Sequence, residues 1–457
     1  MFSYLKIIFS SLANSSYIAS HMNSRNMRIS HIICPVAGVV ALASCSSEDH
    51  VKIKDPITMM SPSPTQPITK VVLDEIQADY LKAGNRMALN FLAAIHDGEN
   101  LICSPLSLQY ALAMTANGAS GETRQEIIDF LGYGEEGIDV LNDYSKSLLE
   151  QLPAVDMEVT LKVADALLVN NMFPLLPSFK ETVETHYYAA VDNMDFNDPD
   201  YVAARINEWS GRNTNGFIDK VLTKGDVSPD AAAYLMNALY FKAKWAGTRH
   251  DPMFIPEDTR TEDFHTSGGK TVKVEMMCNQ RYHEYAELDG YKVLVLPYAG
   301  RKFNMYVLLP DDNDIDGLVE KLRDTSWDDI LGSLKQDAEV HVKLPKFEVE
   351  KKYELSDVLK SLGVEKAFVQ GEAEFDCMFE PKPGYYYWIN KVIQKSRIAV
   401  SEWGTEAGSV TVVEMNAESA MPSEPKKVYF HADRPFVFVI GEGTSGAILF
   451  EGVCMRP

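Results

Sequence analysis

The residues best suited to chemistry in this chain are its ten histidines and six cysteines. The cysteines include no CxxC and no other close pair, so their spacing predicts neither a disulfide framework nor a structural zinc site. The histidines of the main body have no acid and nucleophile at a spacing typical of catalysis. We therefore expect surface or structural histidines at positions 265, 283, 341 and 431, and small buried thiols at Cys103, Cys278, Cys377 and Cys454.

The sequence also lacks the common nucleotide-binding, metalloprotease and hydrolase signatures, namely GxGxxG, GxxxxGKS/T, HExxH and GxSxG. These absences predict a protein that is not an enzyme and that uses no metal and no other cofactor. Its formal net charge of −22 would repel nucleic acid and anionic membrane surfaces, so we expect neither as a direct partner. For the same reason we do not expect activation by heparin-like polyanions.

One long connection, GTEAGSVTVVEMNAESAMPSEPKK at 404–427, has the alternating pattern of a strand. Connections of this length inside a compact domain are usually functional or disordered. If the first half became a strand, both of its glutamates would lie on one face. The opposite face would be small and uncharged; it would carry Thr405, Ala407, Ser409, Thr411 and Val413. Gly404 provides a pivot before this stretch, and no proline follows until Pro422.

Such a segment could store free energy in the folded chain. Its insertion between two existing strands would form up to about 20 backbone hydrogen bonds, each worth roughly 0.5–1.5 kcal/mol net. Ordering the backbone would cost about 1–2 kcal/mol per residue, and burial of the uncharged face would offset that cost. The native fold would then be metastable, and cleavage of the connection would release it. The alternative interpretation is a solvated loop whose alternation is accidental, and the pattern alone leaves both open.

The elements that must position this segment are helical early and extended late in the chain. Apolar spacing predicts helices over 78–94, after Ser104-Pro105, and over 122–131. Strand patterns follow at 291–310, as a hairpin around Ala299-Gly300, and at 340–347, 388–400 and 436–440. This order predicts an α+β fold. With no internal linker or repeat, residues 74–457 form one large domain.

The first 45 residues have the pattern of a targeting signal. Arg28 precedes a short apolar run over 32–43, which is below the roughly 20 residues that a membrane-spanning helix needs. Leu42-Ala43-Ser44-Cys45 resembles a bacterial lipobox in which Cys45 is lipidated, although an ordinary signal with an incidental cysteine is the alternative. The true start could be Met27. Residues 46–73, rich in Ser, Thr and Pro, are predicted to form a flexible tether.

Ordered sequence blocks from about residue 74 to the end resemble the serpin family. They include NLICSPLSLQYALAMTANGASGETRQEI, INEWSGRNTNGFIDKVL, MNALYFKAKW, VHVKLPKFEVEKKYELSDVLKSLGV, AVSEWGTEAGSV, FHADRPFVFVI and GAILFEGVCMRP. The resemblance implies a fold of three β-sheets with eight or nine helices and an exposed reactive-centre loop at about 402–427. It also implies inhibition of a serine or cysteine protease, in which the loop is cleaved as a substrate, forms an acyl-enzyme and inserts into the central sheet.

The resemblance assigns roles to individual residues. The hinge would comprise Glu402, Gly404, Thr405, Ala407, Gly408, Ser409 and Val410. Here Trp403 replaces the usual acid, and Val410 is larger than the usual alanine. The shutter, where the central sheet opens, would comprise Ser104, Ser107 and Asn237, with Gln394 in place of the usual histidine. The breach, where the loop first enters, would contain Trp245. Each of these residues could instead serve only in core packing.

The resemblance places the reactive bond by its distance from the hinge, at Glu418–Ser419. Because the loop is extended distally, Met415 and Met421 are alternatives. A glutamyl-preferring protease would match Glu418, and enzymes with apolar pockets would match either methionine. We expect a monomeric inhibitor, either secreted or held at the outer membrane or cell surface by a lipid on Cys45. A non-inhibitory serpin that acts as a binding protein is the alternative, and Trp403 and Val410 are its only support.

Overall fold

The computed structural model describes residues 66–457 except 135, 249 and 406–425, and all of these lie within one compact unit, Val51–Pro457. The predicted signal at 1–45, Cys45 and most of the tether lie outside the described residues. So do Ala407, Gly408, Ser409 and Val410 of the hinge, and the candidate reactive-bond residues Met415, Glu418, Ser419 and Met421. None of the described helices has the length and hydrophobicity that a bilayer-spanning helix needs.

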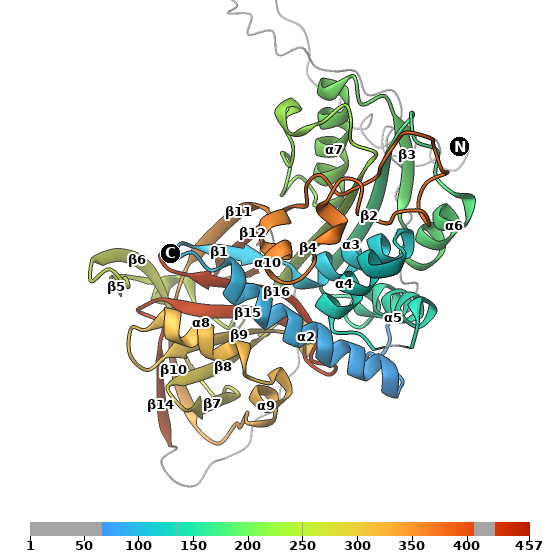
Figure 1. Cartoon of the computed structure of the whole chain (residues 1–457). Helices are drawn as coiled ribbons and strands as arrows, with labels where there is room; N and C mark the ends of the chain where they lie inside the picture. Colours follow the sequence, from blue (N-terminus) through green and yellow to red (C-terminus); the bar gives the residue numbers. More distant parts are fainter. Residues whose placement is uncertain (1–65, 135, 249, 406–425) are drawn as a thin grey trace, which may run out of the picture. The chain divides into compact units, whose positions relative to one another are not determined.

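Nine α-helices lie in the described part of the chain (Figure 1). They are α2 (Glu75–Ile95), α3 (Pro105–Gly118), α4 (Gly121–Leu131), α5 (Ile138–Gln151), α6 (Pro177–His186), α7 (Pro199–Asn213), α8 (Ile315–Arg323), α9 (Trp327–Gly332) and α10 (Ser356–Ser361). The three helices predicted from the sequence are α2, α3 and α4. α2 begins a few residues earlier than predicted because Asp74 and Gln77 form a reciprocal capping box there.

The strands form three sheets among the described residues, which confirms the predicted α+β architecture. The central six-stranded sheet has the order β11-β12-β13-β4-β2-β3. Its strands are β2 (Thr160–Asn170), β3 (Ala190–Met194), β4 (Ala233–Lys244), β11 (Phe347–Glu354), β12 (Ile393–Ser401) and β13 (Gly404–Thr405).

A second six-stranded sheet has the order β1-β16-β15-β9-β8-β7, and a four-stranded sheet has the order β14-β10-β6-β5. The former contains β1 (Leu101–Cys103), β7 (Tyr285–Leu288), β8 (Tyr291–Pro297), β9 (Phe303–Pro310), β15 (Phe436–Glu442) and β16 (Ile448–Cys454). The latter contains β5 (Arg260–His265), β6 (Thr271–Arg281), β10 (Glu339–Pro345) and β14 (Lys427–His431).

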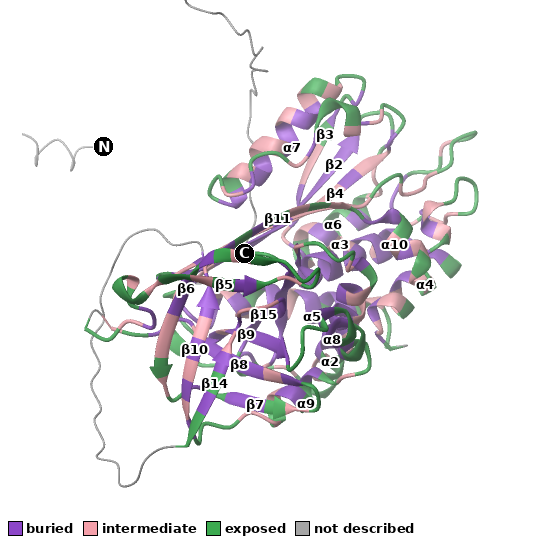
Figure 2. Ribbon diagram, turned by 90° about the vertical axis from the view of Figure 1, so that its left-hand side faces the viewer, coloured by how far each residue is buried: buried purple, intermediate pink, exposed green. Residues whose placement is uncertain are grey.

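The two faces of the central sheet have different neighbours, as Figure 2 shows for α7 on one side and α3 and α6 on the other. Alternate residues of β2 separate the two sides, because side chains of a strand point to opposite faces. Ala164, Ala166 and Leu168 pack with α7. Leu161, Val163 and Leu167 belong instead to the main hydrophobic core.

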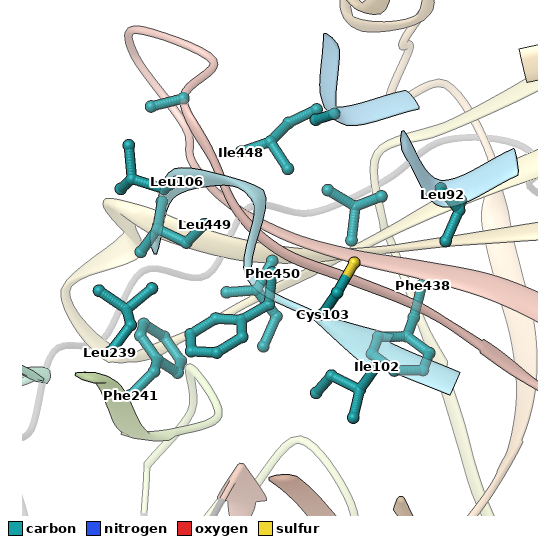
Figure 3. Close-up of a cluster of buried hydrophobic side chains, with 14 of the residues drawn as sticks. Leu92, Ile102, Cys103, Leu106, Leu239, Phe241, Phe438, Ile448, Leu449 and Phe450 are labelled. Atoms are coloured by element: carbon teal, nitrogen blue, oxygen red, sulfur yellow. The ribbon is translucent and has the colours of Figure 1, made fainter. Parts of the chain in front are cut away.

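The main core lies between the central sheet, the second six-stranded sheet and α2 to α5. Figure 3 shows a part of it, where side chains from α2, β1, α3, β4, β15 and β16 meet. Ile102, Leu92 and Phe438 are completely buried there. Cys103 and Cys454 are buried as predicted, whereas Cys278 and Cys377 are only half-buried.

Two strand predictions differ from the structure. The run 340–347 is divided: β10 ends at Pro345 and β11 begins at Phe347, so the chain passes from the four-stranded sheet to the central sheet. The run 388–400 becomes a strand only from Ile393. Before that point its backbone forms hydrogen bonds with residues outside the sheet. The amide of Ile389 donates to the carbonyl of Ala367, and the carbonyl of Val392 accepts from the amide of Leu355.

Candidate functional site

The short strand β13 lies between β12 and β4 at one end of the central sheet. Thr405 is opposite Val400 of β12 and Ala243 of β4, and both pairings are antiparallel. β12 and β4 therefore run parallel to each other and are separated by the width of one strand. Within the described residues, only Gly404 and Thr405 occupy that space. Gly404 and Thr405, which lie near the start of the predicted hinge, thus already form a strand of the sheet.

Gly404 is the position at which only glycine fits. Its φ is +135°, a value that other residues rarely adopt. An added Cβ would also collide with the carbonyl oxygen of Ala243 on β4. The close approach of two backbones therefore requires glycine here.

Thr405 is buried and hydrogen-bonded to the core side of the sheet. Its Oγ1 lies 2.5 Å from the hydroxyl of Tyr298, and burial raises the pKa of Tyr298 far above its ordinary value. The indole of Trp245 stacks on the Tyr298 ring, with 4.7 Å between centroids and 5° between planes. Trp245 Nε1 also donates to the carbonyl of Ser401 at 2.8 Å. Trp245, which the resemblance assigns to the breach, therefore lies beside β13.

Glu402 anchors the chain just before the hinge. Its carboxylate is 7% exposed, accepts a hydrogen bond from Thr259 Oγ1 at 2.8 Å and pairs with Lys346 Nζ at 3.2 Å. Burial alone would raise the pKa of Glu402, but these two groups and its own backbone amide together hold it below its ordinary value. Trp403, the next residue, is half exposed.

The predicted shutter residues meet at the start of α3. Ser104 caps α3, since its Oγ accepts from the Ser107 amide at 3.2 Å. The amide of Gln394 on β12 holds Ser104 twice: Nε2 donates to the Ser104 carbonyl at 2.8 Å, and Oε1 accepts from its N–H at 3.2 Å. Ser107 Oγ donates to Asn237 Oδ1 on β4. Both strands that flank the gap are therefore attached to the same helical turn.

Cavities lie on both faces of the sheet between β4 and β12. The cavity on the α3 side has a volume of about 90 Å³ and is lined by Leu108, Leu112 and Met378. The cavity on the α7 side has about 50 Å³ and is lined by Ile206 and Trp209. The two share the wall residues Tyr234, Leu235, Asn237, Lys391 and Ile393. The sheet is therefore incompletely packed along the path that continues from β13.

The described hinge residues and Trp245 thus lie together at one end of the gap, and the residues assigned to the shutter lie together further along it. Sequence reasoning missed the partners Tyr298, Thr259 and Lys346, which become neighbours only through the fold. It also missed Asp165 on β2, whose signal was visible as one acid within the apolar run VADALLV. Among the described residues, no group of His, Cys, Asp and Glu side chains is arranged to hold a metal ion.

Comparison with known proteins gives the same family from sequence and from fold. The serpin (serine protease inhibitor) family model matches residues 82–457. Serpin-Z10 of Arabidopsis thaliana is 31% identical over 379 residues, which cover 81% of this chain and 95% of the relative. The native structure of tengpin, a thermophilic serpin, has 28% identity, a TM-score of 0.74, and coverage of 86% of this chain and 98% of tengpin. Thyroxine-binding globulin in complex with thyroxine shares the fold at 22% identity, with a TM-score of 0.72 and coverage of 83% and 99%. The chain therefore belongs to the serpin family.

Proposed function

We propose that this protein inhibits a serine or cysteine protease as a suicide substrate whose cleaved loop inserts into the central sheet. Serpins are generally protease inhibitors and not enzymes. The observation that carries the proposal is β13, where Gly404 and Thr405 already fill the first positions between β12 and β4. A cleaved loop would extend this strand into the gap beyond it.

The register of β13 predicts where each inserted residue would lie. Because both pairings are antiparallel, each step along the loop meets the preceding residue of β12 and of β4. Thr405 lies opposite Val400 and Ala243, so Thr411 would come opposite Gln394 and Asn237. Insertion to the shutter would therefore place a threonine between the two strands that α3 holds.

The parity of the loop suits this register. Thr405 points toward Tyr298 in the core, so every second residue after it would also face the core. These are Ala407, Ser409, Thr411 and Val413, which are small and uncharged. Glu406 and Glu414 would face the other side of the sheet. The cavities along the gap would lose volume as these side chains enter.

Formation of an SDS-resistant complex with a protease tests the proposal. Thr405→Arg should convert the inhibitor into a substrate, because the charge would leave the buried position of Thr405 beside Tyr298 and insertion would have to bury it there unpaired. Trp403→Arg is the matched control, since it adds the same charge to an exposed neighbouring residue. Clipping without a complex in the unmodified protein would indicate a non-inhibitory binding protein. An equally stable complex with Thr405→Arg would contradict the assignment of faces.

The bond that the protease attacks is proposed to be Glu418–Ser419, with Met415 and Met421 as alternatives. The support is the spacing from Glu402, whose carboxylate is held by Thr259 and Lys346. Mass spectrometry of the C-terminal peptide released after reaction with proteases of glutamyl and apolar preference identifies the bond. Cleavage outside the segment from 406 to 425 would contradict this assignment.

We further propose a bacterial lipoprotein that is attached to the outer membrane or cell surface through Cys45 and acts as a monomer. The support is the lipobox-like Leu42-Ala43-Ser44-Cys45 and the Ser- and Pro-rich stretch that follows it. Metabolic labelling with a fatty-acid probe should mark the protein, and Cys45→Ala should abolish the label. Equal labelling of this variant would exclude lipidation at Cys45.

A further inference from the structure

Asp165 is a buried acid in the middle of the central sheet. It belongs to β2, directly opposite Asn237 of β4, and is 3% exposed. Its parity is that of Leu161, Val163 and Leu167, so its side chain lies on the core face of the sheet. Asp165 Oδ1 accepts a hydrogen bond from Asn237 Nδ2 at 2.7 Å, whereas its Oδ2 is buried without a partner.

This carboxyl is connected to the shutter through Asn237. The amide of Asn237 donates to Asp165 with its nitrogen and accepts from Ser107 with its oxygen. Asp165 therefore fixes which way the amide faces, and the amide holds β4 to α3. Asn237 thus links Asp165 of β2 to Ser107 of α3 by two hydrogen bonds.

The surroundings of Asp165 offer its charge little compensation. The charge of Asp165 raises the pKa of two nearby tyrosines, Tyr110 of α3 and Tyr187, which follows α6. Tyr133 and Tyr144 lie close to Tyr110. Burial raises the pKa of each of these four hydroxyls, so all remain protonated near neutral pH. The Tyr110 hydroxyl is itself buried without a partner.

Two cations lie on or near the opposite face of the sheet, and one of them, Lys391, is exposed to solvent and lines the cavities beside Asn237. The other is Arg205 of α7, which is paired with Asp192. Burial therefore dominates: it raises the pKa of Asp165 to about 7, although the hydrogen bond from Asn237 lowers it. The carboxyl of Asp165 thus changes charge near neutral pH.

We propose that Asp165 is a proton-sensitive positioning residue of the shutter: its neutral form keeps the central sheet closed, and its ionisation speeds opening of the sheet to an entering strand. This inference rests on the proposed inhibitory function. A buried carboxylate with one unmatched oxygen is costly, whereas a sheet that opens at Asn237 admits water to it. Ionisation therefore destabilises the closed sheet more than the opening one.

The direction of the pH effect follows from linkage. Between the unfolded pKa of an aspartate and a folded value near 7, the closed state holds a proton that the unfolded chain has lost, so stability falls as pH rises through this window. Above about pH 7 this contribution is constant. With that pKa, the ionised fraction of Asp165 increases about 30-fold between pH 5.5 and pH 8.5.

A synthetic peptide of residues 405–414 tests the inference without a protease. Its incorporation into the intact protein, followed on native gels, should be at least about fivefold faster at pH 8.5 than at pH 5.5. The increase cannot exceed the roughly 30-fold change in the ionised fraction of Asp165. Asp165→Asn and Asp165→Ala should both reduce this ratio to nearly one, because neither side chain ionises. Their thermal midpoints should also decrease less over the same pH range than that of the unmodified protein, and the remaining decrease comes from other buried acids such as Glu451. Asp230→Asn, which neutralises an exposed acid before β4, should leave the ratio unchanged.

The controls separate this inference from the proposed function. Complex formation with a protease is compared as the ratio of variant to unmodified protein at each pH, so that the pH dependence of the protease cancels. Failure to form any complex would overturn the proposed function, while the melting data would still test Asp165. A pH ratio in Asp165→Asn and Asp165→Ala equal to that of the unmodified protein would overturn the role of Asp165.

Discussion

At the scale of single residues, two buried acids of the core differ in how their oxygens are satisfied. Glu442 of β15 accepts hydrogen bonds from the amides of Thr444 and Ser445 and from the Ser445 hydroxyl. Glu451 of β16 has only the weak donor Cys103 Sγ at 3.6 Å, and its Oε2 has no partner. Burial raises the pKa of Glu451 well above its ordinary value, so it is held as a neutral acid.

This difference predicts opposite effects of one substitution at the two positions. Glu451→Met removes an unsatisfied polar group at similar volume, so it should stabilise the native state by about 1–3 kcal/mol. The gain should be larger at pH 8 than at pH 5, because a raised folded pKa makes the acid progressively less favourable as pH rises. Thermal melting followed by intrinsic fluorescence at both pH values measures it.

Glu442→Met is the matched control for that measurement. It leaves three donors without an acceptor and should lower the melting temperature. A decrease for Glu451→Met of the same size as that for Glu442→Met would show that Glu451 is satisfied in a way that its contacts do not indicate.

At the scale of elements, the predictions that succeeded were those with a local physical cause. Ser104-Pro105 begins α3 because a serine cap and a proline in the first turn satisfy the free amides. The hairpin of β8 and β9 turns at Gly300, whose φ is +77°. Local sequence could not predict that residues 388–392 stay outside the sheet, because their backbone partners, Leu355 and Ala367, come from distant segments.

Local sequence likewise predicts only some features of the hinge. Gly404 and the alternation after it are visible in the sequence, and so is their suitability for a strand. That Thr405 is already paired on both sides, and is held by Tyr298, depends on contacts between residues far apart in the chain. Asp165 is visible in the sequence as one acid within an apolar run, but its hydrogen-bond partner Asn237 lies on the neighbouring strand and is brought to it only by the fold.

Gly404 permits a direct test of β13. Gly404→Ala should expel the hinge from the sheet, because its Cβ would collide with the backbone of Ala243 and because φ of +135° is unfavourable for alanine. We expect faster proteolysis of the hinge and a smaller fraction of protease trapped per cleaved loop. Gly137→Ala, at a positive φ with open space around its Cβ, is the control for backbone strain alone. Unchanged trapping would mean that the paired hinge is not required.

At the scale of the whole molecule, the incomplete packing between β4 and β12 leaves room for the strand that the proposed insertion would add. The cavities on both faces of the sheet lie along the path that continues from β13. A strand in this gap would satisfy its backbone on both sides and fill the cavities with small side chains. The proposed insertion would need cleavage, because the chain after residue 425 continues into β14, which is paired with β10 of the four-stranded sheet.

The molecule clipped within 406–425 should therefore melt at a higher temperature than the intact one, by about 10 °C or more for a gain of several kcal/mol. Scanning calorimetry of the two forms at one pH measures the difference. Thr405→Arg, clipped in the same way, should gain little, because its charge would have to be buried beside Tyr298 for the strand to enter. Equal melting temperatures of the intact and clipped unmodified protein would mean that cleavage releases no stored free energy, and a protease could then be bound but not trapped by this fold.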